Sequence, residues 1–448
     1  MRVLVAGASG CVGHAVVRAL RSRGHKVIEA SRHVSDGPSS LHLDYNKPVD
    51  PSLWASRLRE RQVDAVVNCV GILMPSATQT FERIHTQGPI ELFRGAAAAG
   101  VTRVIQISAL GVGDDAESIA TPYLHSKLLA DETLATLALD WAVLRPSLIY
   151  GPGSQSAALF ATLASLPVIS LPGRGQQTVQ PIHVYEVAEA VARLLEQPGA
   201  LADVFELGGA SAMSYRDMLQ HYRNALGLPP ALWLPMPMML MRLLAWTSEA
   251  LPQKVFCRDT IHLLARSKVP TPNSANALLG RSASPLAQGL TVTPAQPMVN
   301  LQVQISPAVS LWLRSSLAFM WLYTALVSLW WPDESGVLNL LAQCGLTGSW
   351  GTAAMLFSCA LNTVLGLWTF QRPGPVVYAL QFGAVLGYTA TAAYFVPALT
   401  IDHCGPLVKN LPALGLIVLL WLSGPVPAKA AFRQGRGAAL HSQHSVWS

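Results

Sequence analysis

Short apolar runs alternate with amphipathic helical patterns over the N-terminal part of the chain. The apolar runs are rich in β-branched residues and lie at Arg2–Ala6, Lys26–Ala30, Ala65–Cys69, Arg103–Ile107 and Ala142–Leu144. The stretch after the first run carries apolar residues at helical spacing from Val12 to Leu20, and Gly24 ends it. Strands that alternate with helices in this way indicate βαβ units. The pattern therefore predicts the α/β class, with a doubly wound parallel sheet of the Rossmann type.

Further elements follow this region. Val184–Glu196 and Ser214–Leu226 have the pattern of helices, and Asp203–Leu207 has that of a strand. Ala231–Leu251 is apolar and rich in methionine. It fits either a helix that covers the substrate side of the N-terminal domain or a helix that lies in a membrane interface. Pro270–Gln304 is rich in Pro, Ser, Asn and Ala, which predicts a linker.

Four long apolar stretches occupy the C-terminal third of the chain. They lie at Val309–Trp331, Thr352–Phe370, Pro375–Pro397 and Leu411–Val426, and only the first contains a charged residue. About 20 apolar residues cross the hydrocarbon core of a bilayer as a helix. The alternative is four buried core helices in succession, which their near lack of charge disfavours. We therefore expect an all-α domain of four transmembrane helices.

The loops between these stretches predict how the chain is oriented. Basic residues without acidic ones occur in the second loop, at Arg372, and in the tail, at Lys429, Arg433 and Arg436. Short cytoplasmic loops of membrane proteins carry an excess of Lys and Arg. Both termini are therefore expected on the cytoplasmic side of a multi-pass protein of the inner or cytoplasmic membrane.

Composition agrees with a membrane domain and excludes several function classes. Charged residues make up 12% of the 448 residues, against roughly 25% in soluble proteins. The net charge of +6 includes no cluster of Lys and Arg with interleaved aromatic residues, which argues against nucleic-acid binding. The six cysteines show no C-x-x-C spacing, so neither a disulfide framework nor a metal site is expected. The first ten residues run into glycines and do not resemble a signal peptide.

Three glycines follow the first predicted strand. Gly7, Gly10 and Gly13 stand at the spacing G-x-x-G-x-x-G, at the point where the first helix begins. Gly7 permits a tight turn, Gly10 lets the backbone approach a pyrophosphate, and Gly13 lets the helix pack close to the strand. The helix N-terminus then faces the anionic pyrophosphate. This arrangement predicts dinucleotide binding.

The choice between NAD and NADP depends on residues after the second strand. A carboxylate there binds the ribose 2′-hydroxyl of NAD, and a basic residue binds the 2′-phosphate of NADP. Arg32 follows the strand and can meet a phosphate with two hydrogen bonds. Glu29, inside the strand, is the competing candidate and favours NAD. We expect NADP, and we assign Asp44 either to the adenine amino group or to a simple turn.

Tyr123 and Lys127 stand four residues apart in a predicted helix and therefore share one helix face. A tyrosine with a pKa of about 10 exchanges protons poorly at neutral pH. A nearby ammonium group favours the phenolate and lowers that pKa. The pair can then move a proton to or from a carbonyl or alcohol oxygen during hydride transfer. Ser108, at the end of the strand Arg103–Ile107, is expected to hydrogen-bond the reacting oxygen.

Taken together, these residues resemble the short-chain dehydrogenase/reductase superfamily, in its extended or atypical branch, and more narrowly the complex-I accessory-subunit type. The segments that carry the resemblance besides the glycines, Ser108 and the Tyr123/Lys127 pair are Asn68–Gly71, Leu144–Pro152 and Gln180–Val184. The resemblance covers about half of the chain, over residues 1–230. The four apolar stretches are similar to a DoxX-type membrane domain.

The superfamily resemblance also implies residues that bind the cofactor beyond Gly7, Gly10, Gly13, Arg32 and Asp44. These are Ser9, Cys11, Val12, Cys69, Val70, Gly71, Lys127 and Pro146. Two departures from the family pattern concern turnover rather than binding. His85 stands where many members carry an asparagine, and Ala109 and Leu110 follow Ser108 where extended enzymes often carry further serines. Ser108 is therefore expected within two positions of the catalytic serine.

Two functions are consistent with this pattern. The first is a membrane-anchored NAD(P)-dependent oxidoreductase whose tether suggests a lipophilic carbonyl or alcohol substrate. The second is a nucleotide-bound accessory or assembly protein of a membrane complex, without catalysis. The predicted parts are an NAD(P)-binding domain with a substrate lobe (1–230), an apolar segment and linker (231–304), a four-span domain (305–430) and a cytoplasmic tail (431–448).

Overall fold

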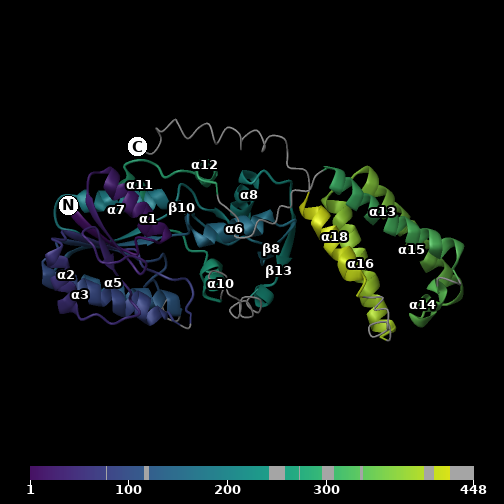
Figure 1. Ribbon diagram of the computed structural model, residues 1–448, viewed down its shortest axis with the longest axis horizontal. Coiled ribbons are helices and arrows are strands. Elements are labelled where there is room, and N and C mark those ends of the chain that lie inside the picture. The colour runs from purple at the N-terminus through teal and green to yellow at the C-terminus, as the bar shows by residue number, and fades with distance from the viewer. Residues whose placement is uncertain are drawn as a thin grey trace. The chain divides into compact units, whose positions relative to one another are not determined.

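The computed structural model describes the chain except for residues 77, 116–120, 242–257, 272, 295–306, 333–335, 398–407 and 424–448. The polypeptide forms two compact units (Figure 1), one from the N-terminal residues up to 299 and one from residues 300–428. The predicted tail lies outside the described residues, as do most of the residues expected in the third loop of the membrane domain.

A parallel sheet of seven strands forms the centre of the N-terminal unit. Its order is β11-β6-β5-β4-β1-β2-β3, and each neighbouring pair is parallel. The strands are β1 (Arg2–Ala6), β2 (Lys26–Ser31), β3 (Ser40–His42), β4 (Ala65–Asn68), β5 (Arg103–Ile107), β6 (Asp140–Pro146) and β11 (Ala202–Leu207). The order reverses at β1, which has β2 on one side and β4 on the other. The doubly wound sheet is confirmed, and ligands of such sheets bind beyond the strand ends at this reversal.

Helices cover both faces of the sheet because its strands are apolar on both faces. Val3 and Val5 of β1 pack toward α1 (Cys11–Ser22) and α7 (Val184–Glu196). Leu4 and Ala6 belong to a second cluster, with buried residues of three helices on the other face. These are α2 (Pro51–Glu60), α3 (Gly88–Ala99) and α5 (Pro122–Ala135). The alternation along β1 thus divides the core into two layers.

A smaller lobe follows β6 in the chain. Its elements are β7 (Ile149–Tyr150), α6 (Gln155–Ser165), β8 (Val168–Pro172), β9 (Thr178–Val179), β10 (Ile182–His183), β12 (Met213–Ser214), α8 (Tyr215–Ala225) and β13 (Leu232–Met236). Its core contains Tyr150, Phe160, Met218, Tyr222 and Leu290, all buried. The predicted helices Val184–Glu196 and Ser214–Leu226 are confirmed as α7 and α8, and the predicted strand Asp203–Leu207 is confirmed as β11.

Two expectations about the chain beyond residue 230 differ from the structure. Ala231–Leu251 does not begin as a helix, because Leu232–Met236 is the strand β13, parallel to β8. The expected linker Pro270–Gln304 holds two short helices, α11 (Ala275–Leu279) and α12 (Leu286–Val292). Both bury leucines against the N-terminal unit, which overall composition does not reveal.

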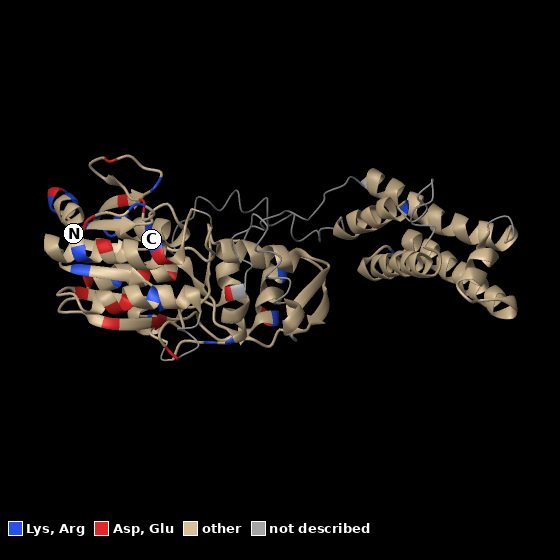
Figure 2. Cartoon of the chain, turned by 90° about the horizontal axis from the view of Figure 1, so that it is seen from below, with Lys and Arg blue, Asp and Glu red and all other residues tan. Residues whose placement is uncertain are grey.

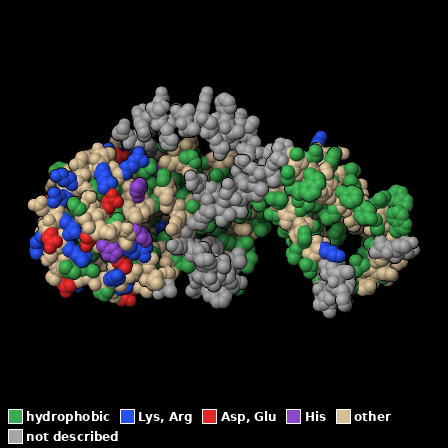
Figure 3. Space-filling model, viewed as in Figure 1, with side chains coloured by type: hydrophobic (Ala, Val, Ile, Leu, Met, Phe, Trp, Pro, Cys, Tyr) green, Lys and Arg blue, Asp and Glu red, His purple; other side chains and the backbone are tan. Residues whose placement is uncertain are grey.

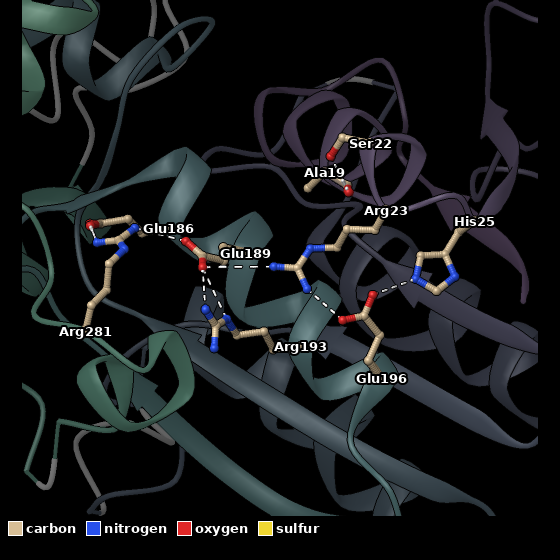
Figure 4. Close-up of polar contacts among 9 residues, drawn as sticks. All are labelled: Ala19, Ser22, Arg23, His25, Glu186, Glu189, Arg193, Glu196 and Arg281. Carbon is tan, nitrogen blue, oxygen red and sulfur yellow. Dashed lines mark hydrogen bonds and ion pairs between the residues drawn. The ribbon is translucent and has the colours of Figure 1, made fainter. Parts of the chain in front are cut away.

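Polar contacts fasten the segment before α12 to α7 (Figure 4). Glu186 of α7 is fully buried, and its Oε1 accepts hydrogen bonds from Arg281 Nη1 at 2.9 Å and from the Ser284 backbone N–H at 2.7 Å. Further along α7, Glu196 accepts from Arg23 at 2.6 Å, beyond the end of α1. Exposed ion pairs such as Glu196–Arg23 contribute roughly 0–1 kcal/mol to the stability of the fold. The buried Glu186 contacts matter more, because a buried carboxylate without partners is costly.

The C-terminal unit is helical at all four predicted places. Its helices are α13 (Pro307–Trp330), α14 (Val337–Gln343), α15 (Gly348–Gln371), α16 (Pro375–Phe395) and α18 (Asn410–Leu422). Among the described residues, only α15 and α16 are long and apolar enough to cross a membrane. The 13 residues of α18 span about 20 Å, against a hydrocarbon core of about 30 Å. A membrane-associated helical domain is therefore supported, and the four-span count and its orientation stay predictions.

Candidate active site

The glycine turn joins β1 to α1 in the predicted way. Gly7 has a left-handed φ of +78°, and the Gly10 N–H donates to Gly7 O at 2.9 Å. A Cβ atom on Gly13 would lie 2.0 Å from Gly7 O, so only glycine permits this close approach. The first turn of α1 carries no acidic residue, and no side chain caps its N-terminus. The helix N–H groups are therefore open to an anion.

Ser9, Cys11 and Val12 belong to the same turn, with Ser9 exposed and the other two half-buried. The Cys11 thiol lies 3.3 Å from Pro152 O and donates to it. Burial raises the pKa of Cys11 to about 11. The thiol is therefore neutral at physiological pH and does not repel a phosphate.

The end of β4 lies directly against this turn. A Cβ on Gly7 would lie 3.0 Å from Val70 N and 3.1 Å from the Cys69 carbonyl carbon, which places Cys69 and Val70 beside Gly7. Asn68 fixes the turn, because its side-chain oxygen accepts from Val70 N at 3.3 Å. Burial raises the pKa of Cys69 to about 12, so this second thiol is also neutral.

The three residues considered for cofactor choice differ in what they contact. Glu29 lies within β2 and pairs with Arg21 at 2.6 Å. Asp44 Oδ1 accepts from the backbone and side-chain nitrogens of Asn46, at 3.2 and 3.1 Å. Arg32, just past β2, is exposed and forms no ion pair with any described residue. Of these three, Arg32 is therefore the one left available to a ligand.

Tyr123 and Lys127 lie on α5, and both are buried. Lys127 Nζ is 5.8 Å from the centroid of the tyrosine ring and donates to Ile107 O at 3.2 Å. A Cβ on Gly71 would lie 3.6 Å from the same Nζ, so the lysine reaches the dinucleotide side of the domain. Burial lowers the pKa of Lys127 to about 8, opposed by the charge of Asp131. Burial also raises the pKa of Tyr123, which makes it a phenol in the absence of a ligand.

Ser108 does not present a free hydroxyl to Tyr123. Its Oγ donates to Oδ2 of the buried Asp131 at 2.7 Å, and Arg145 Nη2 lies 3.6 Å from the same oxygen. Burial raises the pKa of Asp131 to about 6, although the Ser108 hydrogen bond and Arg145 oppose this. Sequence reasoning missed Asp131, whose only signal is its position four residues after Lys127. The predicted contact of Ser108 with a substrate oxygen stays a prediction.

His85 packs against the Tyr123 ring. It lies on a short π-helix (Glu82–Gln87), and its ring meets the Tyr123 ring edge-on with centroids 5.5 Å apart. His85 Nε2 accepts from the Ile72 N–H at 3.0 Å, and Nδ1 lies 3.0 Å from Ser126 Oγ. Burial lowers the pKa of His85. The histidine is therefore neutral and held on both ring nitrogens.

The other side chains packed around Tyr123 are apolar. Leu73, Phe81, Ala109 and Leu263 pack against the cluster that contains Tyr123. Leu263 comes from α10 (Arg258–Ala265), an element that the sequence pattern did not reveal. On the other side, Pro146 ends β6, and its carbonyl accepts from the Leu110 N–H at 3.1 Å. The site thus combines a glycine turn with one buried phenol and one buried ammonium group, the phenol lying among apolar side chains.

Comparisons with known proteins agree with this geometry. The profile of the NAD dependent epimerase/dehydratase family matches residues 3–208, and that of the DoxX-like family matches residues 318–418. A 3-diazoavenalumate denitrifying reductase of Streptomyces sp is 30% identical over 279 residues, which are 55% of this chain and 88% of that protein.

Two more relatives are more distant. Subunit 9 of the NADH dehydrogenase [ubiquinone] 1 alpha subcomplex of Rattus norvegicus is 24% identical, over 52% of this chain and 63% of the subunit. A solved nucleoside-diphosphate-sugar epimerase of Staphylococcus aureus, 16% identical, superposes with a TM-score of 0.51 over 65% of this chain and all of that one, which shows a shared fold. The chain therefore belongs to the NAD-dependent epimerase/dehydratase family of short-chain dehydrogenase/reductase-like Rossmann proteins and carries a C-terminal DoxX-like domain.

Proposed function

We propose that the protein is a membrane-anchored NADP-dependent oxidoreductase that acts on a carbonyl or alcohol group of a lipophilic substrate. The observation that carries the proposal is the buried pair of Tyr123 and Lys127, with the tyrosine among apolar side chains and the lysine beside Gly71, after the end of β4. When bound, the nicotinamide dinucleotide supplies or accepts the hydride. All other steps fall to residues of the chain.

The residues at the turn fit a dinucleotide. The uncapped N-terminus of α1 presents its N–H groups to a pyrophosphate, Gly10 lets the backbone approach it, and Gly13 lets α1 pack against the turn. Arg32 supports NADP over NAD, because its guanidinium is free while Glu29 is already paired with Arg21. The remaining predicted contacts, from Ser9 to Pro146, line the same end of the sheet, and we assign them to the cofactor.

Proton transfer is assigned to Tyr123. A buried phenol donates its proton to a developing alkoxide when a positive charge nearby stabilises the phenolate that remains. Lys127 provides that charge, and we propose that it also binds the nicotinamide ribose. Asp131 keeps Lys127 protonated at neutral pH, because its carboxylate raises the pKa of the ammonium group. Ser108 holds Asp131 in place by its hydrogen bond. We propose that, after a change of rotamer, its hydroxyl hydrogen-bonds the substrate oxygen.

The membrane assignment rests on the C-terminal unit. Two helices, α15 and α16, have the length and composition of spans. We propose that α13 and α18 complete a four-span domain, with both termini in the cytoplasm as the basic residues of the second loop and the tail suggest. Residues up to 299 then form the catalytic unit, rather than residues 1–230 alone, because β13, α10, α11 and α12 pack within it.

The alternative is a nucleotide-bound accessory protein without turnover. The observation that favours it is the capture of Ser108 by Asp131, together with the apolar residues Ala109 and Leu110 that follow. The likeness to a complex-I subunit supports the same view, although the chain spans only 63% of that subunit's length. Under this alternative the protein co-purifies with a membrane complex and its cofactor is neither oxidised nor reduced.

The test is Tyr123→Phe in the full chain, assayed by NADPH oxidation against a panel of aldehydes, ketones and membrane lipid extracts. We expect turnover to fall about 10²- to 10⁴-fold, the usual contribution of a general acid, while NADPH affinity is unchanged. Tyr215→Phe is the matched control, because Tyr215 is equally buried but lies in the core of the smaller lobe. A Tyr123→Phe protein with unchanged turnover would remove the role assigned to Tyr123.

A further inference from the structure

One edge of the smaller lobe lacks charged residues. The chain contains no Asp, Glu, Lys or Arg between Arg145 and Arg174, and none between Arg223 and Arg242. These two segments supply α6, β8 and β13. Charged side chains instead gather on the nucleotide-binding half of the unit (Figures 2 and 3). An uncharged region of this kind is unusual for a surface that faces water on all sides.

Large apolar side chains project from this region. Leu232 and Leu234 of β13 are 47% and 50% exposed, and Met239 and Leu240, just beyond it, are 85% and 43% exposed. The two leucines share one face of the strand, because alternate residues point the same way. Single exposed apolar residues are ordinary on protein surfaces, but a continuous group marks an interaction site. We call these four residues the β13 edge.

Another β-strand is a poor fit for the β13 edge. The N–H groups of Leu232 and Met236 point toward β8, where they donate to Pro167 O at 2.9 Å and Gly173 O at 3.1 Å. The odd-numbered residues therefore face the free side of the strand. Two of them, Pro235 and Pro237, have no N–H to donate. Strand addition by a second protein or a second copy of the chain is thus blocked where it would begin.

Two exposed arginines lie near β13 and its partner strand β8. Arg174 follows β8, and Arg216, at the start of α8, has its guanidinium 5.2 Å from the centroid of the Trp233 ring, on the face of β13 opposite Leu232 and Leu234. Among the described residues neither arginine forms an ion pair. The nearby Asp217 accepts from the Ser214 hydroxyl at 2.7 Å. Exposed leucine and methionine side chains with basic residues nearby are typical of surfaces that lie in the headgroup region of an anionic bilayer.

We propose that the β13 edge lies in the lipid–water interface and holds the smaller lobe of the N-terminal unit against the membrane. The occupant is the bilayer, because the same chain carries helices long and apolar enough to anchor it there, and a tethered surface meets its membrane at high effective concentration. The inference rests on the proposed membrane anchorage. It also narrows the substrate class to molecules whose apolar part resides in the membrane.

The test uses the full chain in vesicles of phosphatidylcholine and phosphatidylglycerol that contain an alkyne-tagged phospholipid. A photo-crosslinking phenylalanine derivative replaces Leu234 in one variant and Leu53 in the other. Leu53 is the matched control, since it is 46% exposed but lies on α2 of the nucleotide-binding half. We expect lipid adducts at position 234 and background labelling at position 53. Retained NADPH binding shows that each variant is folded.

Further measurements distinguish a failure of the docking proposal from a failure of the proposed membrane anchorage. Arg174→Gln should lower the ratio of docked to undocked protein about fivefold in anionic vesicles, the effect of one basic residue near such a surface, and leave it unchanged in pure phosphatidylcholine. Equal labelling at positions 234 and 53, or chain-to-chain adducts at 234, would overturn the docking proposal alone. Release of the unmodified protein from membranes by alkaline carbonate would overturn the anchorage and the docking with it.

Discussion

The ionisation of Lys127 makes a prediction that requires no knowledge of the substrate. Burial lowers the pKa of this lysine to about 8, so about nine in ten molecules carry the charged form at pH 7. We propose that the charged form binds the nicotinamide ribose. The affinity for NADPH should therefore be constant below pH 8. Above pH 8 it should weaken by up to tenfold per pH unit, because the proton must be taken up on binding.

Asp131→Asn should move this break in the binding curve to lower pH. The Asp131 carboxylate opposes the effect of burial on the pKa of Lys127. A unit charge roughly 6 Å away at an effective dielectric constant of about 20 contributes about 2–3 kcal/mol, which sets an upper limit of roughly two pH units. At pH 7.5 the variant should therefore bind NADPH more weakly than the wild type. Below pH 6 the two affinities should converge.

The assay is fluorescence titration of the purified full chain with NADPH between pH 5 and 9.5. Glu132→Gln is the matched control, because it removes the same charge from the adjacent, exposed position of α5. The control should leave the break near pH 8. An affinity that does not change with pH, or an equal response of the two variants, would refute the assignment of Lys127 and Asp131.

Three further substitutions test other parts of the account. Gly13→Ala should lower the melting temperature and abolish its rise with NADPH, since the added methyl would overlap Gly7 O; an unchanged rise counts against the turn as the pyrophosphate site. Arg32→Glu should shift the ratio of NADH to NADPH affinity at least about tenfold toward NADH, the loss of a charged hydrogen bond; equal losses for both cofactors would place Arg32 elsewhere. Glu186→Leu should destabilise the N-terminal unit by about 1–3 kcal/mol in pulse proteolysis, because it removes the acceptor of the Ser284 N–H and of Arg281 Nη1, although Arg281 keeps its contact with Glu189; an unchanged stability would contradict that role.

Local patterns predicted most of the sheet and the chemistry at its edge. The runs at β1, β2, β4, β5 and β6 are buried β-branched segments, and burial on both faces produces such runs. The glycine turn was predictable because each glycine answers a local steric need. The Tyr123/Lys127 pair was predictable because both residues belong to one helix.

Features that depend on distant partners were not predictable in this way. The strand β13 reads as part of an apolar, Met-rich segment, and only its pairing with β8, which lies far earlier in the chain, makes it a strand. The role of Asp131 depends on Ser108 and Arg145, which come from other elements. The helices α11 and α12 lie in a segment whose composition resembles a linker, but their leucines meet a core built from earlier residues.

The central claim is that this chain transfers a hydride to a substrate from the membrane. Its most direct test is to incubate membranes that contain the full chain with NADPH deuterated at the transferable position, and to follow deuterium by mass spectrometry in the lipid-extractable and aqueous fractions. We predict that deuterium appears in a lipid-extractable compound with the wild type and is lost with Tyr123→Phe. NADPH that stays bound and fully deuterated, with no label in either fraction, would contradict the account and favour the accessory role.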